Sequence, residues 1–365
     1  MGKRIVIMAG GTGGHVFPAL AVAELLMEKG WQVSWLGTQK GLESRVIPEN
    51  GIEIDWLSVA GVRGKGLTAK ITAVFMLFNA CVQAMKILRK RKPDVVLGMG
   101  GFVAGPGGLM AKLLGIPLII HEQNRIPGTT NRLLARLANQ VLEAFPDSFS
   151  GKVKAKCTGN PLRKQFLTAM ENGRQRYEKE IRILIFGGSQ GAQILNETVP
   201  EAIAEFQKSG LAMQSVQIKH QTGAAMLPQV KSRYKALDIE ADTNAFIDDM
   251  VAAYQWADLV ICRAGAMTVS EVAAMGVPAI FIPLPSAIDP LPSAIDDHQA
   301  ANARYLTDAG AGLLLMQKDL NPATLAEHIT KALKQLDVMS VDARHCARPE
   351  ATAVVVDYCI AEAGL

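Results

Sequence analysis

Two glycine-rich loops, each between a short apolar run and a helical pattern, constrain the fold of this chain more than any other feature. Residues 10–15 read GGTGGH, follow the apolar run 4–9 and precede a helix expected to open near Pro18. Residues 187–191 read GGSQG and follow the apolar run 181–186. Glycines allow sharp turns and close backbone approach, and the N–H groups that begin a helix favour an anion. The sequence therefore predicts two strand–loop–helix units that bind a phosphate or another anion.

Short apolar runs of strand length recur along the chain, and helical patterns separate them. Strands are expected at 4–9, 32–36, 94–97, 117–120, 181–186, 214–220, 259–262 and 279–282. This alternation predicts parallel βαβ units, and it restarts after Arg163. The chain of 365 residues is also longer than the roughly 250–300 residues at which one core stops growing. The sequence therefore predicts an α/β protein with two doubly wound parallel sheets.

Composition and cysteine spacing exclude several classes of protein. The chain is 49% hydrophobic and 20% charged, which excludes a disordered protein. Its five cysteines show no CxxC or Cys/His spacing, so we expect neither disulfides nor structural zinc. The net charge of +4 is too small to indicate nucleic acid as a partner. No run of about 18 apolar residues occurs, so no membrane-spanning helix is predicted.

Neither glycine loop matches the fingerprint of a dinucleotide site. That fingerprint needs GxGxxG and an acidic residue at the end of the second strand, whereas the second strand here ends in WLGT at 35–38. The P-loop pattern GxxxxGK[ST] does not occur in the sequence either. These differences argue against nicotinamide enzymes and P-loop nucleotide hydrolases. They favour a nucleotide-sugar enzyme that uses no cofactor.

A second group of candidate residues follows the apolar run 259–262. Thr268 and Glu271 have the T-x-x-E spacing of a capping box, which predicts that a helix opens at Thr268. A compatible alternative is that this helix start presents N–H groups to a diphosphate, while Glu271 accepts from two ribose hydroxyls. Gln299, farther along the chain, is a candidate to contact the same ligand.

One seven-residue segment occurs twice in tandem, because residues 283–289 and 290–296 both read PLPSAID. The copy is too short for a repeat fold, so it predicts one lengthened loop, which costs little free energy. Because the loop precedes Gln299, the duplication puts the geometry of that residue, and with it activity, in question.

Six motifs, in the same order and spread over nearly the whole chain, resemble the MurG family of bacterial N-acetylglucosaminyltransferases. They are GGTGGHVFP at 10–18, GMGGF at 98–102, HEQN at 121–124, GNPLR at 159–163, GGSQGA at 187–192 and RAGAMTVSE at 263–271. The resemblance implies the GT-B fold, in which two Rossmann-like domains flank an interdomain cleft. It assigns residues 1–163, joined by a C-terminal helix at 341–365, to the lipid I acceptor. It assigns residues 164–340 to UDP-N-acetylglucosamine.

The resemblance also implies a reaction. N-acetylglucosamine would pass from UDP-N-acetylglucosamine to the 4-hydroxyl of the muramic acid of lipid I, with inversion. The product, lipid II, would serve the bacterial cell wall and so cell shape and division. The resemblance implies no metal. His15 is the candidate general base, and its alternative role is to orient a substrate or cap the helix. Glu122 is a second acid–base candidate, and its alternative role is structural.

The resemblance implies a set of substrate-binding residues, which we assign motif by motif. Thr12, Gly13 and Gly14 would line the cleft, and Asn124, Arg163 and Ser189 would contact the donor or its diphosphate. The uracil would meet the backbone of Ile247. The diphosphate and ribose would meet Ala266, Met267, Thr268, Val269, Ser270 and Glu271, and the sugar would meet Gln299.

Residues 65–92 combine apolar side chains with flanking lysines and arginines. The apolar members are Ile71, Val74, Phe75, Leu77, Phe78 and Val82. One interpretation is a core-facing helix with a solvated basic end. The other is peripheral attachment to anionic lipid, where each nearby cation contributes about 1 kcal/mol. The resemblance favours attachment to the cytoplasmic face of the bacterial inner membrane.

Two alternative functions are compatible with these patterns. One is another GT-B glycolipid or antibiotic glycosyltransferase, against which the acceptor-side motifs at 98–108 and 121–124 argue. The other is a nucleotide-sugar-binding protein that the duplicated loop has made inactive. Binding of the nucleotide sugar without turnover would reveal that case.

Overall fold

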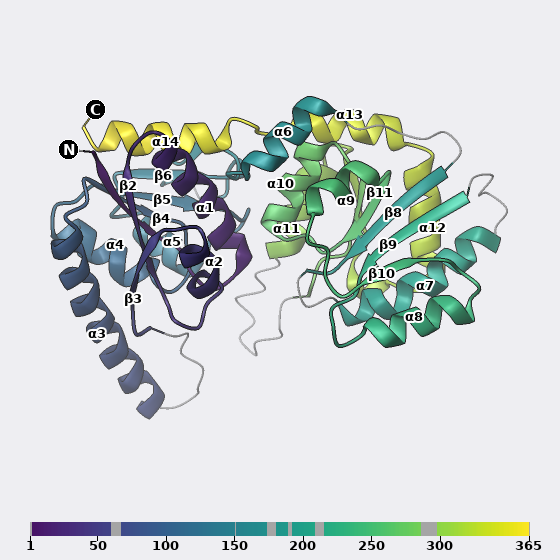
Figure 1. The fold of residues 1–365 in the computed structure, drawn as a ribbon, viewed down its shortest axis with the longest axis horizontal. Coiled ribbons are helices and arrows are strands. Elements are labelled where there is room, and N and C mark those ends of the chain that lie inside the picture. The colour runs from purple at the N-terminus through teal and green to yellow at the C-terminus, as the bar shows by residue number, and fades with distance from the viewer. Residues whose placement is uncertain are drawn as a thin grey trace. The chain divides into compact units, whose positions relative to one another are not determined.

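The computed structural model describes residues 2–59, 67–149, 151–173, 180–188, 192–208, 215–285 and 298–364, with only the backbone of 67–73. The chain divides into two compact units (Figure 1). Unit 1 comprises Met1–Arg163 and Arg348–Leu365, and unit 2 comprises Lys164–Ala347. Each unit is a parallel sheet with helices packed on its faces.

Unit 1 is built on a sheet whose strands, among the described residues, run in the order β3-β2-β1-β4-β5-β6-β7. The chain leaves the central β1 first through β2 and β3, and then through β4 to β7, which is the doubly wound arrangement. The elements of unit 1 are β1 (Arg4–Met8), α1 (Gly13–Glu28), β2 (Gln32–Gly37), α2 (Glu43–Glu49), β3 (Glu53–Trp56), α3 (Leu67–Arg91), β4 (Val95–Gly98), α4 (Ala104–Leu113), β5 (Leu118–Glu122), α5 (Thr129–Leu134), β6 (Gln140–Glu143), β7 (Lys156–Cys157) and α14 (Ala351–Glu362).

The central strands of unit 1 are buried on both faces, which explains their nearly continuous apolar sequences. Successive side chains of β1 point to opposite faces of the sheet. Ile5 and Ile7 pack with α1 and α14, whereas Val6 and Met8 pack with α3 and α4. The last helix, α14, is therefore part of the core of unit 1 and contacts α1 (Figure 1).

Unit 2 repeats the plan with the strand order β10-β9-β8-β11-β12-β13 among the described residues. Ile181, Ile183 and Ile185 of β8 face α7 and α12, while α10 contacts α11 and α13. The elements of unit 2 are α6 (Lys164–Asn172), β8 (Glu180–Phe186), α7 (Gln193–Lys208), β9 (Ser215–Gln221), α8 (Leu227–Ala236), β10 (Asp242–Asn244), α9 (Met250–Trp256), β11 (Leu259–Cys262), α10 (Ala266–Met275), β12 (Ala279–Phe281), α11 (His298–Thr307), β13 (Gly312–Leu314), the 3₁₀ helix η1 (Gln317–Asp319), α12 (Pro322–Leu333) and α13 (Leu336–Cys346).

The prediction of two doubly wound parallel sheets is confirmed, but two helix starts differ from the prediction. α1 begins at Gly13 rather than near Pro18, so His15 lies in the first helical turn. The capping box expected at Thr268 is wrong. Gly265 has the extended backbone of an N-cap, with φ −62° and ψ 147°, so α10 begins at Ala266 and Thr268 is its third residue.

Candidate active site

In unit 1 the candidate residues gather at the carboxyl edge of the sheet. β1, β4 and β5 are neighbouring parallel strands. The segments that follow them supply His15, Gly100 and Gln123. Because parallel strands end together, residues that lie far apart in the sequence meet at this edge. Ligands of doubly wound sheets bind there.

The first glycine loop leads directly into α1. Gly11 has a φ of 94°, which would strain any other residue, and Thr12 is the extended N-cap. Gly13 and Gly14 lie in the first turn, where N–H groups have no acceptor within the helix. That turn carries no acidic side chain. The helix start therefore favours an anion or a negatively polarised oxygen.

Glu43, at the start of α2, holds this loop in place. Its buried carboxylate accepts from the Gly11 N–H at 2.9 Å. It also accepts from the N–H and the hydroxyl of Thr38, at 2.9 and 2.7 Å. The Gly11 N–H is thus committed to a carboxylate of the protein, and a ligand would meet the later N–H groups of the helix start.

The glycine cluster after β4 packs against the first loop. A Cβ on Gly101 would lie 2.5 Å from the Gly10 carbonyl oxygen. A Cβ on Gly100 would lie 2.9 Å from both Nδ1 and Cε1 of His15. Both positions also have positive φ, so only glycine permits this approach. This cluster therefore positions His15.

His15 is partly buried and is linked to the end of β5 through Gln123. His15 Nδ1 lies 2.8 Å from Gln123 Oε1, and Gln123 Nε2 lies 3.1 Å from His121 Nδ1. His121 Nε2 lies 2.9 Å from the Gly159 carbonyl oxygen. Burial lowers the pKa of His121 to about 4, against the smaller opposing effects of the Gly159 hydrogen bond and the Glu122 charge. His121 is therefore neutral at pH 7.

Because the pKa of His121 is lowered, we expect the free energy of unfolding of unit 1 to decrease at acidic pH. The unfolded side chain takes up a proton near its ordinary pKa of about 6.5, while the folded one stays neutral to about pH 4. The unfolded state therefore binds more protons between these values, and stability falls as the pH falls. Between pH 7 and pH 5 this one group should remove about 2 kcal/mol of unfolding free energy.

Urea unfolding followed by tryptophan fluorescence measures this loss, since Trp31, Trp35 and Trp56 all belong to unit 1. His121→Gln, which cannot be protonated, should lose about 2 kcal/mol less than the wild type over the same pH interval. Equal losses in both proteins would contradict the assignment to His121.

The Glu122 carboxylate is only 1% exposed and accepts hydrogen bonds on both oxygens. Oε1 accepts from the backbone and side-chain amides of Asn124, at 2.9 and 3.2 Å. Oε2 accepts from the Gly128 N–H at 3.0 Å and from Asn131 Nδ2 at 2.9 Å. This geometry favours the structural role of Glu122, which orders the segment that carries Asn124.

Arg163 lies over α1. Its guanidinium carbon is 5.2 Å from the centroid of the Phe17 ring, in cation–π geometry. A Cβ on Gly13 would lie 2.9 Å from the same ring. The structure therefore brings Arg163, Phe17 and the start of α1 together within unit 1.

In unit 2, Gln221 at the end of β9 joins the second glycine loop to the predicted uracil contact, Ile247. Its Nε2 donates to the Gly188 carbonyl at 2.8 Å, and its Oε1 accepts from the Ile247 N–H at 2.9 Å. Gly188 has a φ of 103° and belongs to the second glycine loop. Ser189, predicted to contact the donor, lies outside the described residues. The Ile247 N–H donates to Gln221. We therefore expect the carbonyl oxygen of Ile247, and not its N–H, to meet the uracil.

The predicted diphosphate and ribose residues form the first half of α10. Among the described residues no side chain caps this helix, and its first turn has no acidic residue. The side chains of Ala266 and Val269 are buried, and the Ser270 hydroxyl donates to the Ala266 carbonyl at 3.0 Å. Glu271 Oε2 accepts from the Tyr254 hydroxyl at 3.2 Å. The N–H groups of the first turn and the Glu271 carboxylate are therefore the groups of this segment whose chemistry suits a diphosphate and a ribose.

Gln299, at the start of α11, anchors the segment in which the duplicated sequence begins. Its Oε1 accepts from the Ala264 N–H at 3.2 Å and from the Leu284 N–H at 2.9 Å. Arg263 donates to the Pro283 carbonyl at 3.0 Å. Residues 286–297, which hold most of the two PLPSAID copies, lie outside the described residues. The described part of the segment is thus tied to the start of α11 and to the residues that precede α10.

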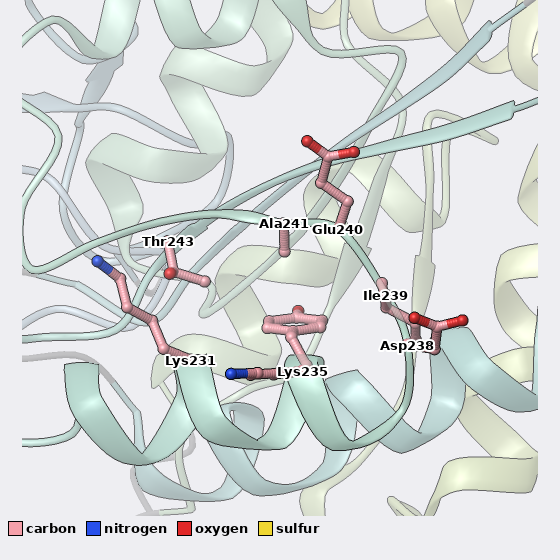
Figure 2. A pocket seen from close by; sticks show the side chains of 8 residues that line it. Lys231, Lys235, Asp238, Ile239, Glu240, Ala241 and Thr243 are labelled. Carbon is pink, nitrogen blue, oxygen red and sulfur yellow. The ribbon is translucent and has the colours of Figure 1, made fainter.

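A separate hollow of about 510 Å³ lies on unit 2 beside α8 and β10. Figure 2 shows Lys231 and Lys235 on the helix, with Asp238, Glu240 and Thr243 on the segment that follows it. Its charges are mixed, and none of the predicted site residues that the structure describes lines it. We therefore place the candidate residues of each unit at the carboxyl edge of its own sheet.

Both units of the chain match models of one protein family. Residues 5–143 match the glycosyltransferase family 28 N-terminal domain, and residues 182–351 match the family's C-terminal domain. The chain is 56% identical, over the full length of both chains, to a UDP-N-acetylglucosamine–N-acetylmuramyl-(pentapeptide) pyrophosphoryl-undecaprenol N-acetylglucosamine transferase of Methylococcus capsulatus. The enzyme of the same name from Shewanella sp. (strain ANA-3) is 48% identical, covering 99% of this chain and 98% of that protein.

The chain belongs to the MurG family. The crystal structure of Acinetobacter baumannii MurG aligns with a TM-score of 0.79 at 41% identity, over 98% of both chains. A glycosyltransferase of kitacinnamycin aligns with a TM-score of 0.68, but at 16% identity it shows only a shared fold.

Four side chains that shape the site are not indicated by the MurG family motifs. They are Glu43, Gln123, Gln221 and Tyr254, and each holds a loop or a predicted ligand contact through a hydrogen bond. Gln123 lies within the quoted motif HEQN, but nothing in that motif indicates that its partner is His15. The other three partners lie 17 to 32 residues away, at spacings that no motif encodes.

Proposed function

We propose that this chain transfers N-acetylglucosamine from UDP-N-acetylglucosamine to lipid I, forming lipid II, with inversion at the anomeric carbon. The observation that carries the proposal is the 56% identity to a named MurG enzyme over the whole of both chains. The acceptor group is the 4-hydroxyl of the muramic acid. Unit 1, which includes the returning helix α14, receives the lipid acceptor, and unit 2 binds the nucleotide sugar.

The geometry of unit 2 supports binding of the donor there. The N–H groups of Ala266, Met267 and Thr268 begin α10 and suit the two phosphates of UDP. Glu271, oriented by Tyr254, suits the two ribose hydroxyls. The carbonyl oxygen of Ile247 suits the N3–H of uracil.

Gln299 suits the sugar, because its oxygen is engaged by two backbone N–H groups and its Nε2 is the remaining donor. Ser189, in the second glycine loop, remains a predicted donor contact.

The geometry of unit 1 supports a single displacement. His15 takes the proton of the acceptor hydroxyl as its oxygen bonds to the anomeric carbon, and the bond from that carbon to the UDP oxygen breaks. Because attack and departure occur on opposite faces, the configuration inverts. Thr12, Gly13 and Gly14 offer a polar rim to the acceptor. Arg163 and Asn124 supply a cation and an amide at the same edge.

A transfer assay tests this function. The purified protein is incubated with labelled UDP-N-acetylglucosamine and a lipid I analogue, with and without EDTA. We expect a β-linked product on the 4-hydroxyl, and we expect its rate to persist in EDTA, because helix N-termini and side chains stabilise the leaving diphosphate. Loss of transfer in EDTA would contradict the metal-free mechanism. Donor binding without any product would support the inactive alternative.

An exposed apolar patch on unit 1 supports attachment to a membrane surface. We define it as the exposed residues Val74, Leu77, Phe102, Leu109 and Leu133, which line one hollow, together with Phe75 and Phe78 of α3. Phe75 and Phe78 are 73% and 66% exposed, and the adjoining hollow of about 470 Å³ is lined mostly by apolar side chains. An exposed patch of this kind marks a binding surface.

The remainder of α3 combines features of both interpretations of this helix. Ala80, Ala84 and Leu88 recur every fourth residue and are buried, as in a core-facing helix. Lys86, Arg89, Lys90 and Lys92 are exposed, and so are Lys112 and Arg132 near the patch residues of α4 and α5. Within the described residues, no helix has both the length and the apolarity to cross a bilayer. We therefore propose peripheral binding to anionic lipid, on the cytoplasmic face of the inner membrane.

Replacing Phe75 and Phe78 together by aspartate should weaken binding to vesicles rich in phosphatidylglycerol at least about tenfold, because each buried phenylalanine contributes about 1.5–3 kcal/mol. Co-sedimentation with vesicles measures the change. The matched control replaces Val338 and Val341 of α13 by aspartate, since both are exposed apolar residues of unit 2. Equal binding by the two double variants would contradict the proposed patch, whereas transfer to a water-soluble acceptor should remain in both.

A further inference from the structure

The link between His15 and the core of unit 1 runs through one amide side chain. We infer that Gln123 is a positioning residue that holds His15 in the tautomer protonated on Nδ1, so that its Nε2 presents a lone pair. This inference rests on the proposed function, in which His15 takes the proton of the acceptor hydroxyl.

The orientation of the Gln123 amide follows from its surroundings. Its Nε2 lies 3.1 Å from the His121 carbonyl oxygen, which can only accept a hydrogen bond. The reversed amide would place two acceptor oxygens against each other. The amide nitrogen therefore faces His121, and the amide oxygen faces His15 Nδ1 at 2.8 Å. Because that oxygen can only accept, His15 Nδ1 carries a hydrogen.

The state of His121 agrees with this orientation. His121 Nε2 lies 2.9 Å from the Gly159 carbonyl oxygen and must donate to it. Since the ring is neutral at pH 7, its Nδ1 is then an acceptor, and Gln123 Nε2 lies 3.1 Å from it. The hydrogen bonds thus run in one direction, from His15 to Gln123, from Gln123 to His121, and from His121 to Gly159.

The surrounding structure keeps this link in place. Asn160 Nδ2 donates to the Gln123 carbonyl at 3.1 Å, and Gly100 lies against the His15 ring. The nearby charges are engaged elsewhere. The Glu43 carboxylate accepts from Gly11 and Thr38, the Glu122 carboxylate accepts from its own loop, and Arg163 lies over Phe17.

Gln123 is uncharged, and this determines how it affects the His15 imidazole. A carboxylate in its place would also select the Nδ1–H tautomer, but it would stabilise a protonated imidazole. The amide selects the tautomer without adding a charge. In this tautomer the His15 Nε2 lone pair is the one that faces a hydroxyl group.

Two measurements test the inference, and the first does not depend on transfer. Nitrogen-15 NMR of the wild type at pH 7 should show His15 protonated on Nδ1, and Gln123→Leu should lose this preference. His15 protonated on Nε2 in the wild type would overturn the inference. The NMR measurement tests the His15 tautomer even if the wild type shows no transfer. Absence of transfer would contradict the proposed function and not the role of Gln123.

The second measurement is the pH–rate profile of transfer. Gln123→Leu should lower kcat about 10²-fold with little change in the KM for UDP-N-acetylglucosamine, because a wrong tautomer removes the base and leaves the donor site intact. Gln123→Glu should restore part of kcat and move the acidic limb of the profile to higher pH. The control is Gln83→Leu, at an exposed hydrogen bond on α3. An unchanged kcat in Gln123→Leu, or an unmoved acidic limb in Gln123→Glu, would overturn the inference.

Discussion

Replacing His15 by alanine is expected to lower kcat for transfer about 10²- to 10⁴-fold, the usual contribution of a general base. The ring has a fixed place, since Gly100 lies against it and Gln123 binds its Nδ1 at 2.8 Å. Affinity for UDP-N-acetylglucosamine should change by no more than about twofold, because loss of a base raises the transition state without weakening donor binding.

Steady-state transfer kinetics and calorimetric titration of the donor measure these two quantities separately. His345→Ala is the matched control, because His345 is exposed on α13 of unit 2 and lies outside the candidate site. Turnover that survives in His15→Ala would remove the base role and leave His15 as a residue that orients a substrate.

Replacing Glu271 by alanine is expected to weaken binding of UDP and UDP-N-acetylglucosamine about 10²-fold. Hydrogen bonds to a charged group contribute about 1.5–3 kcal/mol each, and two ribose hydroxyls would share this carboxylate. The kcat at saturating donor should fall much less, because the ribose is bound equally before and during the reaction.

Titration calorimetry with UDP alone measures the effect without any acceptor. Tyr254→Phe provides a graded comparison, since it keeps the carboxylate and removes the hydroxyl that lies 3.2 Å from it. Its loss of affinity should be smaller than that of Glu271→Ala. Unchanged UDP affinity in Glu271→Ala would contradict the ribose contact.

The central strands could be predicted because their signal is local. The apolar run at 259–262 is β11, and the run at 181–186 is β8 extended by one residue. Both are buried on two faces, so their sequences are nearly continuous in apolar residues. The edge strands β7 and β10 carry no such signal, because they are only two and three residues long and contain no run of apolar side chains.

The start of α1 could not be predicted from local preference. Gly13 and Gly14 are poor helix formers, so the sequence favoured a start near Pro18. In the structure Glu43 holds Gly11, and Gly101 packs against Gly10, which shapes the loop so that the helix begins at Gly13. Contacts from two other segments outweigh the low helix propensity of these glycines.

The sequence by itself determined the two doubly wound sheets, the positions of the glycine loops and membership of a glycosyltransferase family, because apolar periodicity, turn residues and motifs are all read within short windows. Only the tertiary structure decided which candidate groups are engaged by the protein itself. The Glu122 carboxylate and the Ile247 N–H have partners within unit 1 and unit 2 respectively, and His15 has Gln123, which is 108 residues away. The direction of a hydrogen bond depends on both partners, and the fold alone brings such distant partners together.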